Sequence, residues 1–138
     1  MGEARKDALR LDFDHRLKLE FHGTKVTSDA GLLAYRELDE AFALTEMVQD
    51  TFQDSRLGSN KQHQLVPLLR QSIYSRLAGY EDVNDAERLS VDPAMRHVVG
   101  GRAMRADKCA ASTSEVGRFE TENLSMKDNL KKLGYPVE

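Results

Sequence analysis

The chain has 138 residues, with 20 Lys and Arg against 23 Asp and Glu, and a formal net charge of −3. This length suits one ordinary domain. The negative net charge excludes a strongly basic protein that binds nucleic acid through its overall positive charge alone. The single cysteine, Cys109, excludes an internal disulfide and a cysteine zinc cluster. No apolar run approaches the roughly 18 residues of a membrane-spanning helix, and the polar N-terminus lacks a signal-peptide core. We therefore expect a cytoplasmic protein with no membrane contact.

The first predicted element is a short β region. Residues 1–8 are polar and are expected to form a disordered tail. From residue 9 to residue 21 apolar and polar residues alternate, which is typical of a half-buried strand. Because this stretch is long for one strand, we expect a break near Asp14 and His15. The β region should end at residues 22–24.

The chain after residue 24 is predicted to be helical. Thr27 or Ser28 is the candidate cap of a first helix, whose apolar residues recur at spacings of three and four. That spacing predicts one buried face, made of Leu32, Tyr35, Leu38 and Phe42. A short helix capped by Thr45 is expected next, and residues 53–60 read as a polar loop.

The strongest helical pattern lies between residue 64 and residue 79. Its apolar stripe is formed by Leu65, Leu69, Ile73 and Leu77. Gly79 is the predicted stop. Pro67 is compatible with the first turn of a helix or with a kink, and the sequence leaves both open.

Short helices are predicted in the last third of the chain. The start signals are Asn84 or Asp85, the pair Asp92 and Pro93, and two capping boxes. The boxes pair Ser112 with Glu115 and Ser125 with Asp128. Gly100 and Gly101 should break the chain. The predicted fold is mainly α, with five to seven helices and a short N-terminal β element, in one domain over residues 9–138.

Nucleophilic and metal chemistry find little support. Cys109 and His97 are twelve positions apart and would need the fold to bring them together. The four histidines show no metal-ligand spacing. An acidic cluster (Glu81, Asp82, Asp85 and Glu87) matches no calcium loop, and helix capping explains it better. We predict no catalytic residue and no metal ligand.

The basic residues suggest a phosphate-binding surface instead. Residues 88–118 hold six basic residues and three acidic ones, although a solvated loop would give the same charge pattern. Two glycines beside several basic residues make a flexible loop rich in hydrogen-bond donors. The candidate DNA contacts are Arg96, Arg102, Arg105, Lys108 and Arg118, with Arg70 and Arg76 in second rank.

Three segments also carry a resemblance to a known family: residues 25–46, 63–101 and 111–121. The most specific run is GYEDVNDAERL followed by DPAMRHVVG. Together, over residues 17–124, they resemble the N-terminal region of bacterial insertion-sequence transposases of the thirteen-eighty group, a DDE family. The resemblance implies a helical region that holds transposon ends, followed by a ribonuclease-H-like domain with three carboxylates and two Mg²⁺ ions.

The first of those carboxylates is expected on a strand that follows the segment RFET, beyond residue 138. None of this chain's aspartates matches a catalytic one, namely Asp29, Asp39, Asp82, Asp85, Asp92 and Asp107. The last residues (SMKDNLKKLGYPVE) depart from the family pattern, which suggests a truncated or frame-shifted gene. The resemblance therefore implies Mg²⁺ only for the complete transposase, and we expect this chain to be inactive alone, with no cofactor of its own.

Three functional hypotheses follow. The leading one is a non-catalytic part of a transposase that binds double-stranded DNA at transposon ends and assists assembly. The second is a helical oligomerisation or interaction module, including a homodimer, or a remnant of a truncated gene, that does not bind DNA. The third, an enzyme centred on Cys109 or the acidic cluster, has no substrate to support it.

Overall fold

The computed structural model describes residues 9–19, 29–54, 56, 62–105 and 107–134. The predicted fold class is confirmed, because in these residues two short strands precede seven α-helices, two 3₁₀ helices and one π-helical segment. The α-helices are α1 (Leu32–Phe42), α2 (Met47–Thr51), α3 (Leu65–Leu77), α4 (Ala86–Leu89), α5 (Pro93–Val99), α6 (Thr113–Arg118) and α7 (Lys127–Lys132). The 3₁₀ helices are η1 (Val83–Asp85) and η2 (Gly101–Met104), and the π-helical segment is η3 (Phe119–Leu124).

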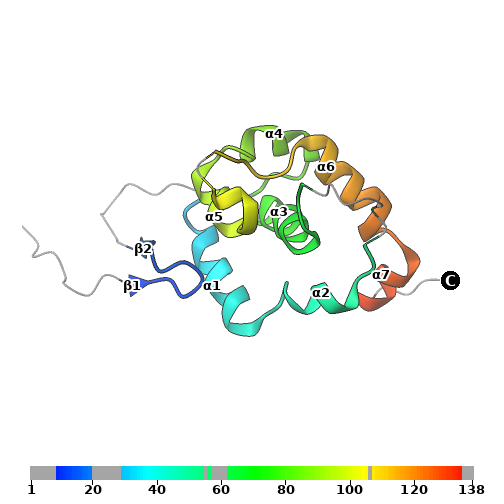
Figure 1. Cartoon of the computed structure of the whole chain (residues 1–138), viewed down its shortest axis with the longest axis horizontal. Helices are drawn as coiled ribbons and strands as arrows, with labels where there is room; N and C mark the ends of the chain where they lie inside the picture. Colours follow the sequence, from blue (N-terminus) through cyan, green and yellow to red (C-terminus); the bar gives the residue numbers. More distant parts are fainter. Residues whose placement is uncertain (1–8, 20–28, 55, 57–61, 106, 135–138) are drawn as a thin grey trace, which may run out of the picture.

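The helices surround α3, which lies in the middle of the molecule (Figure 1). One apolar cluster joins α2, α3 and α6 around Phe52, Leu68 and Phe119. A second cluster joins α1, α4 and α5 around Leu32, Leu89 and Val98. Burial of these side chains supplies the main driving force for folding.

The N-terminal β element is a hairpin. Strand β1 (Leu9–Arg10) pairs antiparallel with β2 (Lys18–Leu19), so the predicted break at Asp14 and His15 is confirmed as the connecting turn. Two oxygens of Asp14 accept hydrogen bonds from the Arg16 side chain, at 2.9 and 2.7 Å. These bonds hold the pKa of Asp14 at about 2, below its usual value. The expected tail over residues 1–8, the end of the β region and the caps Thr27 and Ser28 lie outside the described residues.

Helix α3 resolves the ambiguity at Pro67. The helix begins at Leu65, so Pro67 lies in its first turn, where the missing N–H has no intrahelical acceptor to lose. Gly79 follows the helix end with a φ of +90°, as expected for a stop. The predicted stripe is only half right, because Ile73 and Leu77 are 40% and 51% exposed.

The predicted buried face of α1 is wrong. Leu32 is buried, but Tyr35, Leu38 and Phe42 are each more than half exposed. The helix turns its charged side chains inward, so that Arg36 and Asp39 are buried instead. A polar cluster of hydrogen bonds and ion pairs accompanies this orientation, although Nε of Arg36 is buried without a hydrogen-bond partner.

That polar cluster centres on the Asp39 carboxylate. Thr45 donates to it from its N–H and its hydroxyl at 2.8 and 2.6 Å, and Nε of Arg70 lies 3.4 Å away. The Tyr74 hydroxyl donates to it at 3.3 Å. Burial alone would raise the pKa of Asp39, but the bonds from Thr45 and the charges of Arg70 and Arg36 lower it. The cluster ties α1 to α3 in addition to the apolar cluster that contains Leu32 of α1 and Tyr74 of α3.

The predicted helix starts have mixed outcomes. Asp92 caps α5 by accepting from the Met95 N–H at 2.9 Å, and Ser112 and Glu115 form the predicted capping box of α6. The box between Ser125 and Asp128 is wrong, because Met126 occupies the cap position of α7 and makes no side-chain cap bond. Ser125 donates instead to the carbonyl of the preceding turn.

Two further predicted caps differ in outcome: Thr45 is displaced from its cap position, whereas Asp85 holds the predicted one. The expected cap Thr45 bonds Asp39, so Glu46 occupies the cap position of α2. Asp82, from the acidic cluster, caps η1 by accepting from the Asn84 N–H at 3.0 Å. Asp85 occupies the cap position of α4 but makes no cap bond with its side chain. Capping is therefore local, and it shifts by a residue or two when a partner from elsewhere competes.

Candidate nucleic-acid interface

The basic residues singled out in the sequence lie on α5, on η2, in the segment after η2 and on α6. They differ in what their charged groups contact. Some bind carbonyl or carboxylate oxygens of the chain itself, and others make no such contact within the described residues. This difference decides which of them are available for a ligand.

Arg96 holds the η2 turn in place. Its Nε donates to the carbonyl oxygen of Ala103 at 2.8 Å, and its guanidinium also donates to the carbonyl of Arg105. The chain turns back towards Arg96 at Gly100 and Gly101, whose φ values of +76° and +59° lie in the region that favours glycine. Arg96 therefore shapes the loop that carries the next two arginines.

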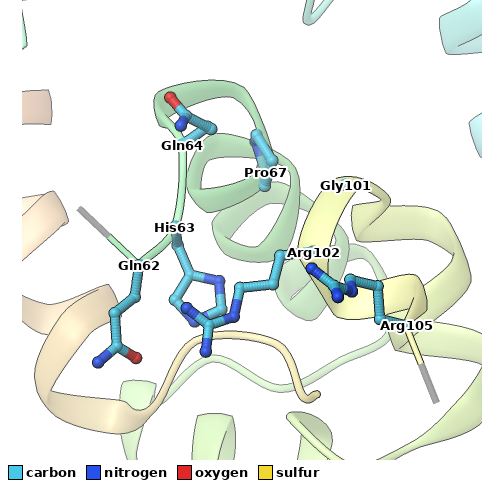
Figure 2. A pocket seen from close by; sticks show the side chains of 7 residues that line it. All are labelled: Gln62, His63, Gln64, Pro67, Gly101, Arg102 and Arg105. Atoms are coloured by element: carbon cyan, nitrogen blue, oxygen red, sulfur yellow. The ribbon is translucent and has the colours of Figure 1, made fainter. Parts of the chain in front are cut away.

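Arg102 and Arg105 line a pocket of about 360 Å³, which we call the η2 pocket. Its opposite wall comes from the start of α3, and its lining is completed by Gln62, His63, Gln64, Pro67 and Gly101. Figure 2 shows Arg102 extending from η2 towards His63, with Arg105 on the far side of the pocket. Neither guanidinium group donates a hydrogen bond to a described residue, and neither forms a salt bridge with a described acidic side chain. The pocket therefore has two positive charges that are in no described salt bridge, although the exposed carboxylate of Asp107 lies near enough to Arg105 for their charges to interact.

His63 forms the buried end of the η2 pocket. It is only 6% exposed, and its Nε2 lies 3.7 Å from a Glu115 oxygen, beyond hydrogen-bond distance. Burial lowers the pKa of His63; the charge of Glu115 opposes this, and the charges of Arg102 and Arg56 add to it. The ring is therefore mainly neutral at pH 7.

The remaining two candidates, Lys108 and Arg118, do not line the η2 pocket. Nζ of Lys108 lies 3.0 Å from the carboxylate of Asp107, its neighbour in the chain. Exposed pairs of this kind contribute little and exchange readily with other partners. Arg118 lies exposed on α6, and no ion pair or hydrogen bond joins its guanidinium to the described part of the chain.

The two second-rank candidates are engaged within the fold. Arg70 is 7% exposed and donates to the Thr45 hydroxyl at 2.8 Å, inside the buried polar cluster. Arg76 makes two bonds to the Glu120 carboxylate, at 2.7 and 3.0 Å. Arg70 therefore has no access to a large ligand, and the charge of Arg76 is neutralised.

The other reactive groups form no site in the described residues. Cys109 is exposed, and His97 lies on α5 with its Nδ1 3.3 Å from an Asp14 oxygen, outside hydrogen-bond alignment. No group of three His, Cys, Asp or Glu side chains that could hold a metal ion occurs within the described ranges. These residues therefore do not fit a two-magnesium site, and we assign no metal-dependent step to them.

A comparison with family models identifies the chain. Residues 9–133 match the family described as transposase DDE domain group 1. The chain belongs to this transposase family. A search of curated proteins and a search of solved structures both found no match. Within the part of this transposase-family chain that the structure describes, no helix has the length and apolar character needed to cross a membrane.

The far wall of the η2 pocket was missed by the sequence analysis. Gln62, His63 and Gln64 lie about 40 positions before Arg102 and Arg105, so no local pattern links them. The one available signal is the abrupt change from a polar loop to a helix with no side-chain cap and no acid in its first turn. A helix start of this kind leaves positive N–H groups free for an anion.

Proposed function

We propose that this chain is the N-terminal part of a DDE transposase of the thirteen-eighty insertion-sequence group, acting on DNA in the cytoplasm. In this role it binds double-stranded DNA at transposon ends and helps to assemble them. Membership of the transposase family supports the DNA partner. The observation that carries the DNA-binding role is that three arginines, Arg102, Arg105 and Arg118, form no salt bridge with a described acidic side chain.

The proposal gives the basic residues different parts. Arg102, Arg105 and Arg118 contact DNA phosphates directly, since guanidinium groups bind phosphate oxygens in pairs. Lys108 joins them by exchanging its exposed partner Asp107 for a phosphate. Arg96 acts indirectly, by fixing the η2 turn. Strand cleavage and its Mg²⁺ ions are assigned to other parts of the complete transposase.

Fluorescence anisotropy with labelled duplex DNA tests this function. We expect weak binding at about 50 mM salt that is largely lost by about 200 mM, because phosphate contacts release counterions. Arg105→Gln together with Arg118→Gln should weaken binding. The matched control is Arg88→Gln on α4, because Arg88 lies 3.6 Å from Asp85 and stacks on Tyr80. A duplex carrying a transposon end should bind more tightly than a shuffled one.

Two results would refute the DNA-binding role. One is the absence of any binding at the lowest salt concentration. The other is a loss of binding free energy per charge removed that is the same for Arg88→Gln as for the double variant, which would show a response to net charge alone. The role in assembly is independent of both results and is tested separately.

A second candidate function, self-association, is favoured by the outward face of α1. Tyr35, Leu38 and Phe42 on α1, with Leu44 and Met47 just after it, expose between 52% and 67% of their surfaces. Taking roughly 200 Å² for each large side chain, this face exposes on the order of 500 Å². That is at the upper end of the largest apolar patch of a typical monomer and approaches the roughly 800 Å² that each partner buries in a stable complex. We propose that a second copy of the chain covers it.

Sedimentation equilibrium tests this assembly. The wild-type chain should form a dimer. Leu38→Lys or Phe42→Lys should raise the dissociation constant of this dimer tenfold or more, because a charge placed in an apolar interface is poorly solvated. Leu133→Lys is the control, since Leu133 is 42% exposed but lies after α7. A monomer at all concentrations would exclude the dimer.

A further inference from the structure

The η2 pocket combines three features that suit an anion. The first is charge, since Arg102 and Arg105 line it and neither forms a salt bridge with a described acid. Glu115, which lies 3.7 Å from His63, is already used in the capping box, where it accepts from the Ser112 N–H at 3.1 Å and the Ser112 hydroxyl at 3.2 Å. The carboxylate is thus held at the start of α6 and does not reach across to the guanidinium groups.

The second feature is the start of α3, which lines the same pocket through Gln64 and Pro67. The helix is 13 residues long, with no side-chain cap and no acid in its first turn. The N–H groups of Leu65 and Val66 make no hydrogen bond within the described chain. The positive end of a three-turn helix therefore opens beside two arginines.

The third feature is the His63 side chain. His63 is 94% buried and lines the pocket. Its ring forms no hydrogen bond with a described residue. Its backbone is fixed, because Arg56 donates to the His63 carbonyl oxygen at 2.7 Å. A neutral imidazole in this position has an N–H to donate and an apolar environment that strengthens the bond.

The size of the pocket limits what it can bind. A volume of about 360 Å³ lies near the lower limit of pockets for small ligands, which run from roughly 300 to 1,000 Å³. It accommodates a phosphate group and part of the sugar attached to it. The lining offers donors but no second aromatic ring on which a base could stack, so recognition falls on the phosphate.

We propose that the η2 pocket binds a single phosphate group, held between Arg102, Arg105, the first turn of α3 and His63. If the phosphate belongs to the DNA backbone of a transposon end, this inference rests on the proposed function. The pocket anchors one defined phosphate, which fixes the position of the helical region along the duplex. Arg118 and Lys108 are left to make exposed contacts.

The first arm of the test uses inorganic phosphate, with chloride at equal ionic strength as the reference. In ¹H–¹⁵N NMR spectra of the full chain, phosphate should move the amide signals of Leu65, Val66 and Gly101. Arg102→Gln or Arg105→Gln should weaken the apparent affinity by about tenfold or more, because each removes charged hydrogen-bond donors to the phosphate. Arg88→Gln on α4 is the matched control, because Arg88 lies outside the pocket, and it should leave phosphate binding unchanged. Well-dispersed spectra verify that each variant is folded.

The second arm measures duplex DNA affinity for the same variants. If Arg102→Gln weakens the binding of both inorganic phosphate and duplex DNA, the pocket holds a DNA phosphate. If phosphate binding responds but DNA affinity does not, the pocket stands as a site for a free phosphate compound and its DNA role is overturned. If DNA affinity falls while phosphate moves no pocket amide, the pocket is overturned and the DNA-binding function stands.

An independent readout comes from the His63 ring. The groups that face it are Glu115 on α6, Arg102 on η2 and the Arg56 side chain beside its carbonyl. A phosphate bound next to the ring should favour its protonated form, and so phosphate should raise the pKa of His63 measured by NMR. Because inorganic phosphate itself takes up a proton between about pH 7 and 5.5, the readout is the His63 pKa and not the pH dependence of phosphate affinity. An unchanged His63 titration would show that the anion lies elsewhere.

Discussion

Replacing Gln71 by alanine tests how the centre of the fold is held together. Gln71 lies on α3 and is 1% exposed. Its Nε2 donates to the Ala111 carbonyl at 2.7 Å, and its Oε1 accepts from the Ala111 N–H at 2.8 Å. Ala111 itself is 0% exposed, so no solvent replaces these bonds in the folded chain. One side chain thus satisfies both backbone groups of a residue 40 positions away.

The cost of Gln71→Ala follows from this geometry. It leaves one N–H and one C=O buried without partners, each costing about 1–3 kcal/mol. The removed atoms leave a space beside α3 that adds a smaller penalty. We expect a loss of about 3–5 kcal/mol in the free energy of unfolding. Gln71→Leu fills the space but leaves both backbone groups unpaired, so it should cost about 2–4 kcal/mol.

Urea unfolding followed by circular dichroism measures this difference. For a chain of this size, a dependence of about 2 kcal/mol per molar urea converts the loss into a midpoint shift of roughly 1.5–2.5 M. Gln49→Ala on α2 is the control, because Gln49 is exposed and should change stability by less than about 0.5 kcal/mol. A Gln71→Ala variant within 0.5 kcal/mol of wild type would refute the reasoning.

Three further predictions concern polar groups that hold the helices in place. Asp39→Asn removes the nearer counter-ion of buried Arg70 and leaves only exposed Glu46, 3.8 Å away, so it should cost about 3 kcal/mol in urea unfolding; no loss would contradict the role of the polar cluster. Asn129→Ala removes bonds to the Gln53 N–H and C=O at 2.9 and 3.1 Å, so hydrogen exchange in α7 should accelerate while that in α3 does not. The lowered pKa of Asp14 stabilises the fold above about pH 4, and that stability should be lost as the pH falls towards 2. Because its ion-pair partner is 67% exposed, the effect should be about 1 kcal/mol and absent in Asp14→Asn.

Local patterns in the sequence predicted much of the fold. The hairpin turn at Asp14, the cap at Asp92 and the capping box at Ser112 all depend on residues within a few positions of one another, and all three were confirmed. Such local hydrogen bonds can be predicted from the sequence because their partners are already close together in the unfolded chain. The end of α3 at Gly79 belongs to the same class.

The orientation of α1 could not be predicted, because its partners are distant in sequence. Its apolar spacing is real, but Asp39 is drawn inward by Arg70 and Tyr74, which lie more than 30 positions away. The roles of Gln71 and Asn129 are hidden for the same reason. Asp, Gln and Asn side chains are usually exposed, so the sequence alone predicts a surface position for each of them.

The candidate site was predictable only on one side. The glycine pair and the arginines that follow it indicated a loop rich in donors, and that loop is present as η2. Its sequence could not show that Arg96 turns inward to two carbonyls, since those carbonyls come together only after the chain reverses at Gly100. Nor could it show that the start of α3 forms the other wall.

The salt dependence of DNA affinity tests the central claim most directly. The logarithm of the binding constant should fall linearly with the logarithm of salt concentration, by about 0.9 for each phosphate contacted. The double variant Arg105→Gln, Arg118→Gln removes two contacts and should reduce that slope by about 1.8, whereas Arg88→Gln should leave it unchanged. A double variant with the wild-type slope, or an affinity that does not change with salt, would contradict the claim that these arginines bind DNA phosphates.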